Sequence, residues 1–217
     1  MKKFNFFLKR AFDIVVSFVV LVIVTVIPVM IIVPILIKLT SKGPVFYKQI
    51  RVGKDKKEFT LYKFRTMITE RYDADGNEIM SENRINRFGR ILRKTSIDEL
   101  PQLFNVLNGT MSIVGPRPML DYQAPRCIGE ENLRFAVRPG ITGLAQVKGR
   151  NNILWEERIK YDIEYIKSFN FWLDIVIIFK TVLLVFKKTG TDVKPEYRGV
   201  DRFSKHYVPE NKEETIN

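Results

Sequence analysis

The sequence predicts a helix-rich α/β protein, of the α+β kind, that is attached to a membrane through its N-terminus. Residues 14–37 form an apolar run without a charged residue, longer than the ~18 residues that suffice for a membrane helix. Residues 45–52 and 59–67 are rich in aromatic and β-branched side chains and are joined by a turn-like segment, as in a β-hairpin. Most of the remaining chain has helical periodicity, so helices should outnumber strands.

The composition narrows the classes of function. The chain has 217 residues, with 36 Lys and Arg against 24 Asp and Glu and a net charge of +12. This suits one compact domain with an appendage, and a surface that attracts nucleic acid, anionic lipid or phosphorylated substrates. The lone Cys127 cannot form an internal disulfide or a structural zinc cluster, which indicates a reducing compartment. Only His206 is available for a Ser-His-Asp triad or a HExxH zinc site, so an enzyme of this sequence would rely on carboxylates, Lys and Arg.

The apolar N-terminal run is predicted to stay in the protein as a membrane segment. It exceeds the ~7–15 apolar residues of a signal peptide and is not followed by an A-x-A-like cleavage site. Lysines and arginines flank it on both sides, which favours keeping both ends in the cytoplasm. Pro28 divides it into arms of about 21 Å and about 14 Å, each shorter than a hydrocarbon core of ~30 Å. The residues leave two arrangements open, a re-entrant hairpin broken at Pro28 and a kinked spanning helix.

The predicted β-hairpin gives one lysine a fixed direction. A period of two places Leu61, Lys63 and Arg65 on one face of the second strand, so Lys63 projects from a rigid element. Residues 73–78 are predicted to form a turn and not a calcium loop, because Gly76 is at the fourth position counted from Asp73, whereas an EF-hand needs glycine at the sixth position.

A helix is predicted over residues 81–94. Ile85, Phe88 and Leu92 share one face, and arginines recur every three residues on another, at positions 84, 87, 90 and 93. Such a row is commonly a solvated face, and at a membrane it would contact anionic headgroups and lead phosphates to the acids that follow.

Two adjacent acids, Asp98 and Glu99, precede the next helix, which is predicted to run through Leu107 and to end at Gly109. Pro101 is tolerated only if the N-cap is Asp98 or a later residue. The acids therefore lie at the positive end of the helix dipole, where carboxylates stay ionised and phosphates are attracted. From position alone, ordinary helix capping is the favoured explanation of two acids here.

Two stiff or glycine-rich segments follow. In residues 112–118, Pro116 and Pro118 fix the backbone around Arg117, which suits a guanidinium that binds phosphate. Residues 138–152 are glycine-rich and basic, and can bring backbone N–H groups close to an anion. We take Pro116, Pro118, Gln146 and Arg150 as candidate substrate-binding residues. The chain has no Walker or Rossmann phosphate-binding sequence.

Two helices and a polar tail complete the chain. Residues 155–169 predict a charged amphipathic helix. Residues 171–188 are apolar with polar residues at intervals of about seven, which predicts an interfacial or core helix and not a second span. The tail, residues 189–217, is predicted to be mobile.

Three of these segments together resemble one family. "YKFRTM", "FGRILRKTSIDELPQLFNVLNGTMSIVGPRP" and "RPGITGLAQVKGRNN" follow an N-terminal membrane segment in this order, and the similarity extends over residues 8–188. The chain resembles the bacterial sugar transferases, the monotopic phosphoglycosyl transferases, and among them the small members that consist of the catalytic unit. The resemblance implies a re-entrant anchor over residues 1–42, a catalytic domain over residues 43–188 that faces the cytoplasm at the inner membrane, and a tail over residues 189–217.

The resemblance also implies an activity. Sugar 1-phosphate would pass from a UDP-sugar to polyprenol (undecaprenyl) phosphate with release of UMP, the first step of capsule, exopolysaccharide or glycoprotein glycan assembly. Asp98 would be the nucleophile and Glu99 the Mg²⁺ ligand, with Lys63 and Arg117 in the active site and Arg93 a phosphate contact. Membrane lipid, and not nucleic acid, would be the further partner.

The sequence departs from the family at the membrane break, where members often have Ser-Pro and this chain has Ile27 before Pro28. The alternative from another class is a non-catalytic membrane-tethered protein that uses its charge to bind anionic lipid or nucleic acid. Such a protein would bind in a salt-dependent way and would be indifferent to Asp98 and Glu99.

Overall fold

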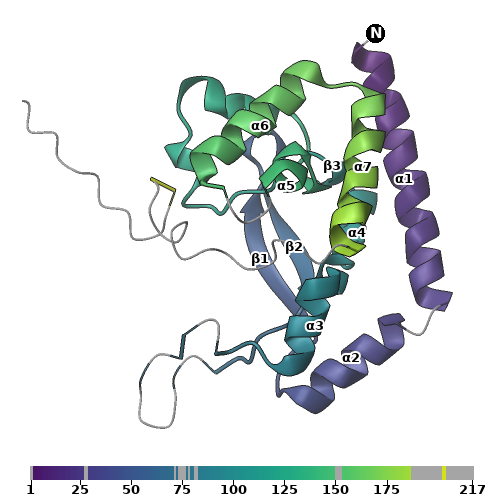
Figure 1. Cartoon of the computed structure of the whole chain (residues 1–217), viewed down its shortest axis with the longest axis vertical. Coiled ribbons are helices and arrows are strands. Elements are labelled where there is room, and N and C mark those ends of the chain that lie inside the picture. The colour runs from purple at the N-terminus through teal and green to yellow at the C-terminus, as the bar shows by residue number, and fades with distance from the viewer. Residues whose placement is uncertain are drawn as a thin grey trace, which may run out of the picture.

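The computed structural model describes residues 2–26, 29–70, 72, 77, 79–80, 83–149, 153–186 and 202–203. Figure 1 shows a helix-rich α/β arrangement in which helices pack beside a narrow hairpin, and this part of the predicted fold class is confirmed. The elements, where η marks a 3₁₀-helix, are α1 Lys2–Val26, α2 Val29–Thr40, β1 Phe46–Val52, η1 Lys54–Lys56, β2 Glu58–Phe64, α3 Arg87–Thr95, η2 Ile97–Glu99, α4 Gln102–Leu107, β3 Ser112–Val114, η3 Ala124–Arg126, η4 Gly129–Ala136, β4 Gly140–Thr142, α5 Leu144–Gly149, α6 Trp155–Ser168 and α7 Phe171–Phe186.

The predicted hairpin is present. Strands β1 and β2 pair antiparallel, and Tyr47 lies opposite Lys63. The connection turns at Asp55, whose φ of 55° is in the left-handed region that aspartate tolerates better than most residues. Lys63 thus stands near the end of a paired strand, as its spacing predicted.

A buried asparagine fixes this hairpin to helix α4. The side-chain oxygen of Asn105 accepts a hydrogen bond from the Tyr62 N–H (3.2 Å), and its amide nitrogen donates to the Thr60 carbonyl (2.7 Å). Because both backbone groups are satisfied by one side chain, β2 and α4 hold a fixed relative position. Lys63 and the turn that precedes α4 are thereby brought to the same place.

A second pair of strands was not predicted from the sequence. Strands β3 and β4 are parallel, with Ser112 opposite Gly140 and Val114 opposite Thr142. Their backbones approach so closely that a Cβ on Gly140 would lie 2.1 Å from the Gly115 nitrogen. Only glycine permits this approach, so the two glycine-rich segments predicted as separate phosphate-binding connections form one platform.

Helix α3 begins later than predicted. The predicted helix started at residue 81, whereas α3 starts at Arg87 with Asn86 as its N-cap, whose side chain accepts a hydrogen bond from the Gly89 N–H (2.6 Å). Ile85 is held outside the helix because it forms a β-bridge with Met67. The N-cap bond and the bridge together override the helical periodicity of residues 83–85.

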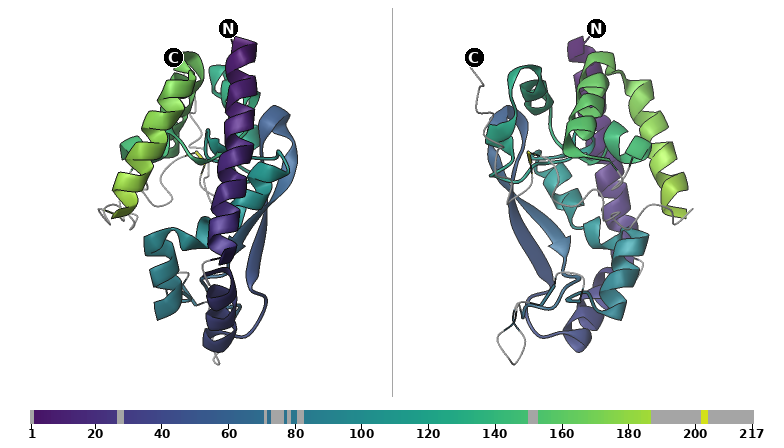
Figure 2. Two further views of the ribbon diagram at one scale, coloured as in Figure 1. Left: turned by 90° about the vertical axis from the view of Figure 1, so that its right-hand side faces the viewer. Right: turned by 60° about the vertical axis from the view of Figure 1, so that its left-hand side comes forward.

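Helix α1 contacts three elements of the rest of the protein through neighbouring polar residues. Lys9 forms an ion pair with Asp174 of α7 (2.6 Å), Arg10 donates to the Val106 carbonyl at the end of α4 (2.8 Å), and Asp13 accepts from the Ser112 hydroxyl of β3. Figure 2 shows α1 running along the whole unit. The first half of α1 is therefore a packed part of this unit.

The predicted break between the two arms lies outside the described residues, since Ile27 and Pro28 are not among them. Helices α1 and α2 flank this point, and α2 turns away from the axis of α1 (Figure 1). In the described part of the chain, no helix has the combined length and apolar character that crossing a bilayer would require.

Large apolar side chains are exposed on α1 and α7, which pack against each other through the edge-on contact of Phe12 and Phe171. The most exposed are Trp172 (75%) and Phe7 (70%). Apolar residues in such number on neighbouring helices typically mark a surface that contacts membrane or another protein. Of the helix predicted over residues 171–188, Phe171–Phe186 are described and helical, with one face buried and another exposed.

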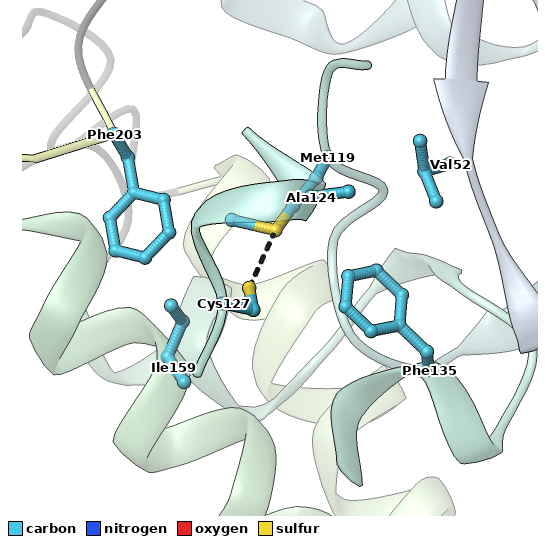
Figure 3. Packing of buried hydrophobic residues seen from close by; sticks show 7 residues of the cluster. All are labelled: Val52, Met119, Ala124, Cys127, Phe135, Ile159 and Phe203. Carbon is cyan, nitrogen blue, oxygen red and sulfur yellow. Dashed lines mark hydrogen bonds between the residues drawn. The ribbon is translucent and has the colours of Figure 1, made fainter. Parts of the chain in front are cut away.

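Two residues of the predicted tail depart from the expected mobility. Phe203 is fully buried in a cluster with Met119, Cys127 and Ile159, and its ring points into this cluster in Figure 3. The Gln123 side chain donates to the Phe203 carbonyl (3.2 Å). The other residues of the tail lie outside the described part of the chain.

We expect Phe203→Ala to expose the single cysteine. The Cys127 thiol is buried, lies 3.6 Å from the Met119 sulfur and has a pKa that burial raises. Loss of the Phe203 ring removes packing around the thiol and so lowers the free energy of the local opening that exposes it. Each ~1.4 kcal/mol by which this free energy falls makes thiol labelling about tenfold faster. Labelling by a thiol reagent should therefore be at least about tenfold faster than in the unsubstituted protein, with the exposed Leu133→Ala as the control that leaves it unchanged.

Candidate active site

The two acids predicted as a pair lie in a single turn between α3 and α4. Helix α3 ends at Ser96, whose φ of 57° reverses the chain, and η2 Ile97–Glu99 follows at once. The Glu99 N–H donates to the Ser96 carbonyl (3.1 Å). Asp98 is 8% exposed, so the turn presents one nearly buried carboxylate beside one that is partly accessible.

The position of these acids differs in detail from the prediction. Helix α4 begins at Gln102 with Pro101 as its N-cap, so the acids precede the α-helix and do not form its first turn. The N-cap still lies after Asp98, as predicted. Pro101 is tolerated in this position because a residue at the start of a helix does not need to donate an N–H to the helix. Neither η2 nor α4 has a side-chain cap hydrogen bond. The capping interpretation of the acids is therefore not supported.

Glu99 is held by two cations. Its Oε1 lies 2.6 Å from the Lys63 Nζ and 3.5 Å from the Arg117 Nη2. Burial by itself would raise the pKa of Glu99, but the charges and hydrogen bonds of Lys63 and Arg117 outweigh it and lower the pKa to about 2. Glu99 is consequently ionised at any physiological pH.

Asp98 has the opposite shift. Burial, and next the charge of Glu99, raise its pKa to about 6, although Lys63, Arg93 and Arg117 act in the other direction. Adjacent carboxylates whose pKa values are pushed apart are typical of sites in which each has its own role. At neutral pH Asp98 is mostly ionised but more basic than an ordinary carboxylate, which suits a nucleophile.

Two arginines near the acids are fixed by hydrogen bonds. The Arg93 Nε donates to the Thr66 hydroxyl (2.9 Å). The carbonyl of Arg117 accepts from the Arg134 Nη2 (2.8 Å), and the same nitrogen lies 2.8 Å from the Asp162 carboxylate in a fully buried ion pair. The backbone of Arg117 is thus held while its side chain, 34% exposed, reaches Glu99.

The structure brings together Asp98, Glu99, Lys63 and Arg117, with the charge of Arg93 acting on Asp98. Of the other predicted substrate-binding residues, Pro116 and Pro118 adjoin Arg117 in the chain. Pro116 accepts a backbone hydrogen bond from Gly140 (2.9 Å), and Pro118 accepts one from Arg51 (3.2 Å). The Gln146 side-chain amide is buried and forms no hydrogen bond within the described part of the chain. Arg150 lies outside the described residues.

The carboxylates fit a magnesium ion that is shared with a substrate. Within the described ranges no group of three or more His, Cys, Asp or Glu side chains converges as a metal cage would. Mg²⁺ commonly binds to one or two carboxylates and to substrate phosphates. Glu99, an ionised carboxylate that is more exposed than Asp98, is the residue of the pair that could hold such an ion.

Arg51 and Arg134 were not identified from the sequence. Both donate hydrogen bonds to backbone carbonyls of the Arg117 segment, at Pro118 and Arg117. Such bonds between distant parts of the chain leave no periodic pattern in the sequence. A cavity of about 220 Å³ lies elsewhere, lined mainly by α1, β3 and residues 136–138, and none of the four central residues borders it.

Comparison with known proteins identifies the family of this chain. The family model described as bacterial sugar transferase matches residues 4–188, which include both carboxylates, their cations and the helices α1 and α7. The chain belongs to the bacterial sugar transferase family. The resemblance inferred from its three motifs is therefore confirmed.

Several family members are similar over most of the chain. The uncharacterized sugar transferase EpsL of Bacillus subtilis is 46% identical over 183 residues, which cover 84% of this chain and 89% of EpsL. The UDP-glucose:undecaprenyl-phosphate glucose-1-phosphate transferase of Klebsiella pneumoniae is 42% identical over 84% of this chain and 41% of its own length. The undecaprenyl-phosphate galactose phosphotransferase of Salmonella typhimurium is 39% identical over 87% of this chain and 42% of its own length. The chain thus spans less than half of the latter two relatives.

Proposed function

We propose that this chain transfers sugar 1-phosphate from a UDP-sugar to undecaprenyl phosphate through a covalent intermediate on Asp98. The observation that carries the proposal is the pair in η2, a nearly buried Asp98 with a pKa of about 6 next to a Glu99 neutralised by Lys63 and Arg117. The names of the Klebsiella and Salmonella relatives, which act on undecaprenyl phosphate, support the substrate class.

The reaction has two displacements at one phosphorus atom. A carboxylate oxygen of Asp98 attacks the sugar-linked phosphorus, the bond from this phosphorus to the bridging oxygen breaks, and UMP leaves with the electron pair. An oxygen of undecaprenyl phosphate then attacks the same phosphorus, and its bond to Asp98 breaks. The carboxylate is regenerated, and the sugar is joined to the lipid through a diphosphate.

The remaining residues reduce the charge on the phosphates. Lys63 and Arg117 are already bound to Glu99 and can turn to the incoming diphosphate, while Arg93 contributes positive charge beside Asp98. Glu99 would hold Mg²⁺, which when bound polarises the phosphoryl oxygens and stabilises the leaving phosphate. Pro116 and Pro118 keep the Arg117 loop stiff.

We also propose that the protein is bound to the cytoplasmic face of the inner membrane. The exposed apolar side chains of α1 and α7 suit insertion into lipid, and the net charge of +12 suits contact of the protein with anionic headgroups. A re-entrant anchor broken at Pro28 would keep the catalytic unit at the depth of the undecaprenyl phosphate head.

The topology is tested with a cysteine introduced at position 5. This cysteine should resist labelling by a reagent added outside intact cells. Labelling of position 5 from outside, with the catalytic unit in the cytoplasm, would exclude the re-entrant topology.

The activity is tested by measuring UMP release from purified protein in detergent or nanodiscs. UDP-glucose, UDP-galactose and UDP-N-acetylgalactosamine are supplied in turn with Mg²⁺ and undecaprenyl phosphate. One donor should give UMP, and omission of the lipid should leave sugar phosphate bound to the peptide that contains Asp98. A protein that binds anionic lipid but turns over no donor in a wider panel of UDP-sugars would contradict the proposal.

The rate of UMP release should depend on the ionisation of Asp98. Because the pKa of the free carboxyl is about 6, kcat/KM for the donor should rise about tenfold for each pH unit below 6 and level off above about pH 7. Glu99, with a pKa of about 2, should add no inflection in this range. A pH series with kcat/KM independent of pH between 5 and 7 would exclude Asp98 as the titrating group.

A further inference from the structure

Arg51 is a guanidinium fixed beside the Arg117 loop. It lies on β1, where the chain bends toward this loop, since its neighbour Val52 forms a β-bridge with Met119. The Arg51 Nη1 donates to the Pro118 carbonyl (3.2 Å), and its Nη2 donates to the Gln49 side chain (2.7 Å). Two of its donors therefore hold the guanidinium in one orientation next to Arg117.

The charge of Arg51 is not neutralised by any ion pair in the part of the chain that the structure describes. Its partners are a carbonyl and an amide, which leave the full positive charge. Burial, and next the charge of Arg117, lower the pKa of Arg51 to about 10, so it stays protonated at neutral pH. Its buried Nε has no hydrogen-bond partner among the described residues.

Without a bound anion, this arrangement costs electrostatic free energy. Two guanidinium groups close enough to lower the pKa of one of them repel each other. Of these two groups, Arg117 forms an ion pair with Glu99, whereas the charge of Glu99 reaches Arg51 only as the smallest of the influences on its pKa. A phosphate between two fixed guanidinium groups accepts hydrogen bonds from both and removes the repulsion. Within the proposed function, the ligand available at this place is the diphosphate of the donor.

We propose that Arg51 binds the diphosphate of the nucleotide-sugar donor together with Arg117. The inference rests on the proposed function for the identity of the ligand, a nucleoside diphosphate. Arg51 would bind one phosphate with its remaining donors while Pro118 and Gln49 keep the guanidinium in place. Lys63 and Arg93 are then free to act at the phosphorus that Asp98 attacks.

A purely supporting role is the competing explanation, because the bond to Pro118 also stiffens the loop that carries Arg117. The two explanations differ when Arg117 is absent. If Arg51 acts only by supporting Arg117, replacing Arg51 should have no further effect on binding once Arg117 is replaced by Gln. If Arg51 contacts the phosphate directly, replacing it should still weaken binding in the Arg117→Gln protein.

The experiment measures binding through the increase in thermal unfolding temperature that UDP, UMP and uridine each produce in the full-length protein. Arg51→Gln should weaken UDP binding about 10- to 100-fold, the range for loss of a hydrogen bond to a charged group. Uridine binding should not change. Lys167→Gln, which removes one charge from an exposed ion pair with Glu130, is the matched control and should bind UDP as the unsubstituted protein does.

The decisive comparison is Arg51→Gln in the Arg117→Gln background, where a further loss of at least about fivefold in UDP affinity is expected. No further loss, or an equal loss for uridine and UDP, overturns the inference. If Arg51→Gln fails to unfold cooperatively, Arg51→Lys replaces it, and unchanged UDP affinity in that variant overturns the inference, because lysine lacks the planar fork of arginine. Release of UMP by the unsubstituted protein tests the proposed function separately, since the binding measurements require no turnover.

Discussion

Asp98→Asn is expected to abolish UMP release and at the same time to make the protein more stable at neutral pH. The amide keeps the shape of the side chain but is no nucleophile, so we expect turnover to fall at least about 10³-fold. No sugar phosphate should be trapped on the peptide. The measurement is UMP release with and without undecaprenyl phosphate, over a range of donor concentrations.

The gain in stability follows from the direction of the pKa shift. The pKa of Asp98 is about 6 in the folded protein against an ordinary value of 3.8, so the folded state holds the proton more tightly than the unfolded chain. The stability that this provides is present below about pH 4 and is lost as the pH rises through 6. At pH 8 the buried charge therefore costs up to about 3 kcal/mol, which Asp98→Asn removes.

Glu99→Gln provides a control of opposite sign. The pKa of Glu99 is lowered to about 2 by Lys63 and Arg117, in spite of burial, so its ionised form stabilises the fold at neutral pH. Loss of this charge leaves both cations without their partner, and the variant should be less stable at pH 8. Denaturant unfolding of both variants at pH 5 and pH 8 checks these signs. An Asp98→Asn protein that turns over normally would exclude Asp98 as the nucleophile.

The central residues of the site could be predicted because each has a local cause. Pro101 restricts where a helix can start and so locates the acids, the period of two along β2 gives Lys63 its direction, and two prolines fix the backbone of Arg117. These signals act within a few residues and are therefore readable from the sequence. The prediction went wrong where a distant contact overrides a local pattern, as when the bridge between Met67 and Ile85 keeps residues 83–85 out of α3.

Other features carry no local signal. Strands β3 and β4 have three residues each, too few for a period, and their glycines suggested loops although they permit a close parallel pair. Arg51 and Arg134 interact with carbonyls 67 and 17 residues away, so no spacing indicates them. Phe203 belongs to a polar tail by composition, yet its ring fills a cluster built from four other parts of the chain.

Arg134→Met is expected to destabilise the protein by about 3–5 kcal/mol. The ion pair of Arg134 and Asp162 is 1% exposed on each side, and removal of one partner leaves a buried charge without its neutralising group. Burial already raises the pKa of Asp162 to about 6, although Arg134 and Arg158 lower it. The single variant should therefore take up a proton at Asp162 more readily, and its stability should fall as the pH rises from 5 to 8.

The double variant Arg134→Met/Asp162→Leu separates the structural cost from the effect on the site. Apolar residues of similar volume can replace a buried ion pair without loss of stability, so most of the 3–5 kcal/mol should return in denaturant unfolding. The Arg117 carbonyl still lacks the hydrogen bond from Arg134, and the loop that presents this guanidinium to Glu99 is no longer held. We therefore expect a stable protein whose kcat/KM for the donor stays about 5- to 30-fold below that of the unsubstituted protein, since loss of one positioning hydrogen bond costs about 1–2 kcal/mol. Full recovery of both stability and activity would mean that Arg134 serves only the core, whereas recovery of stability alone identifies the bond to the Arg117 carbonyl as the part that supports the reaction.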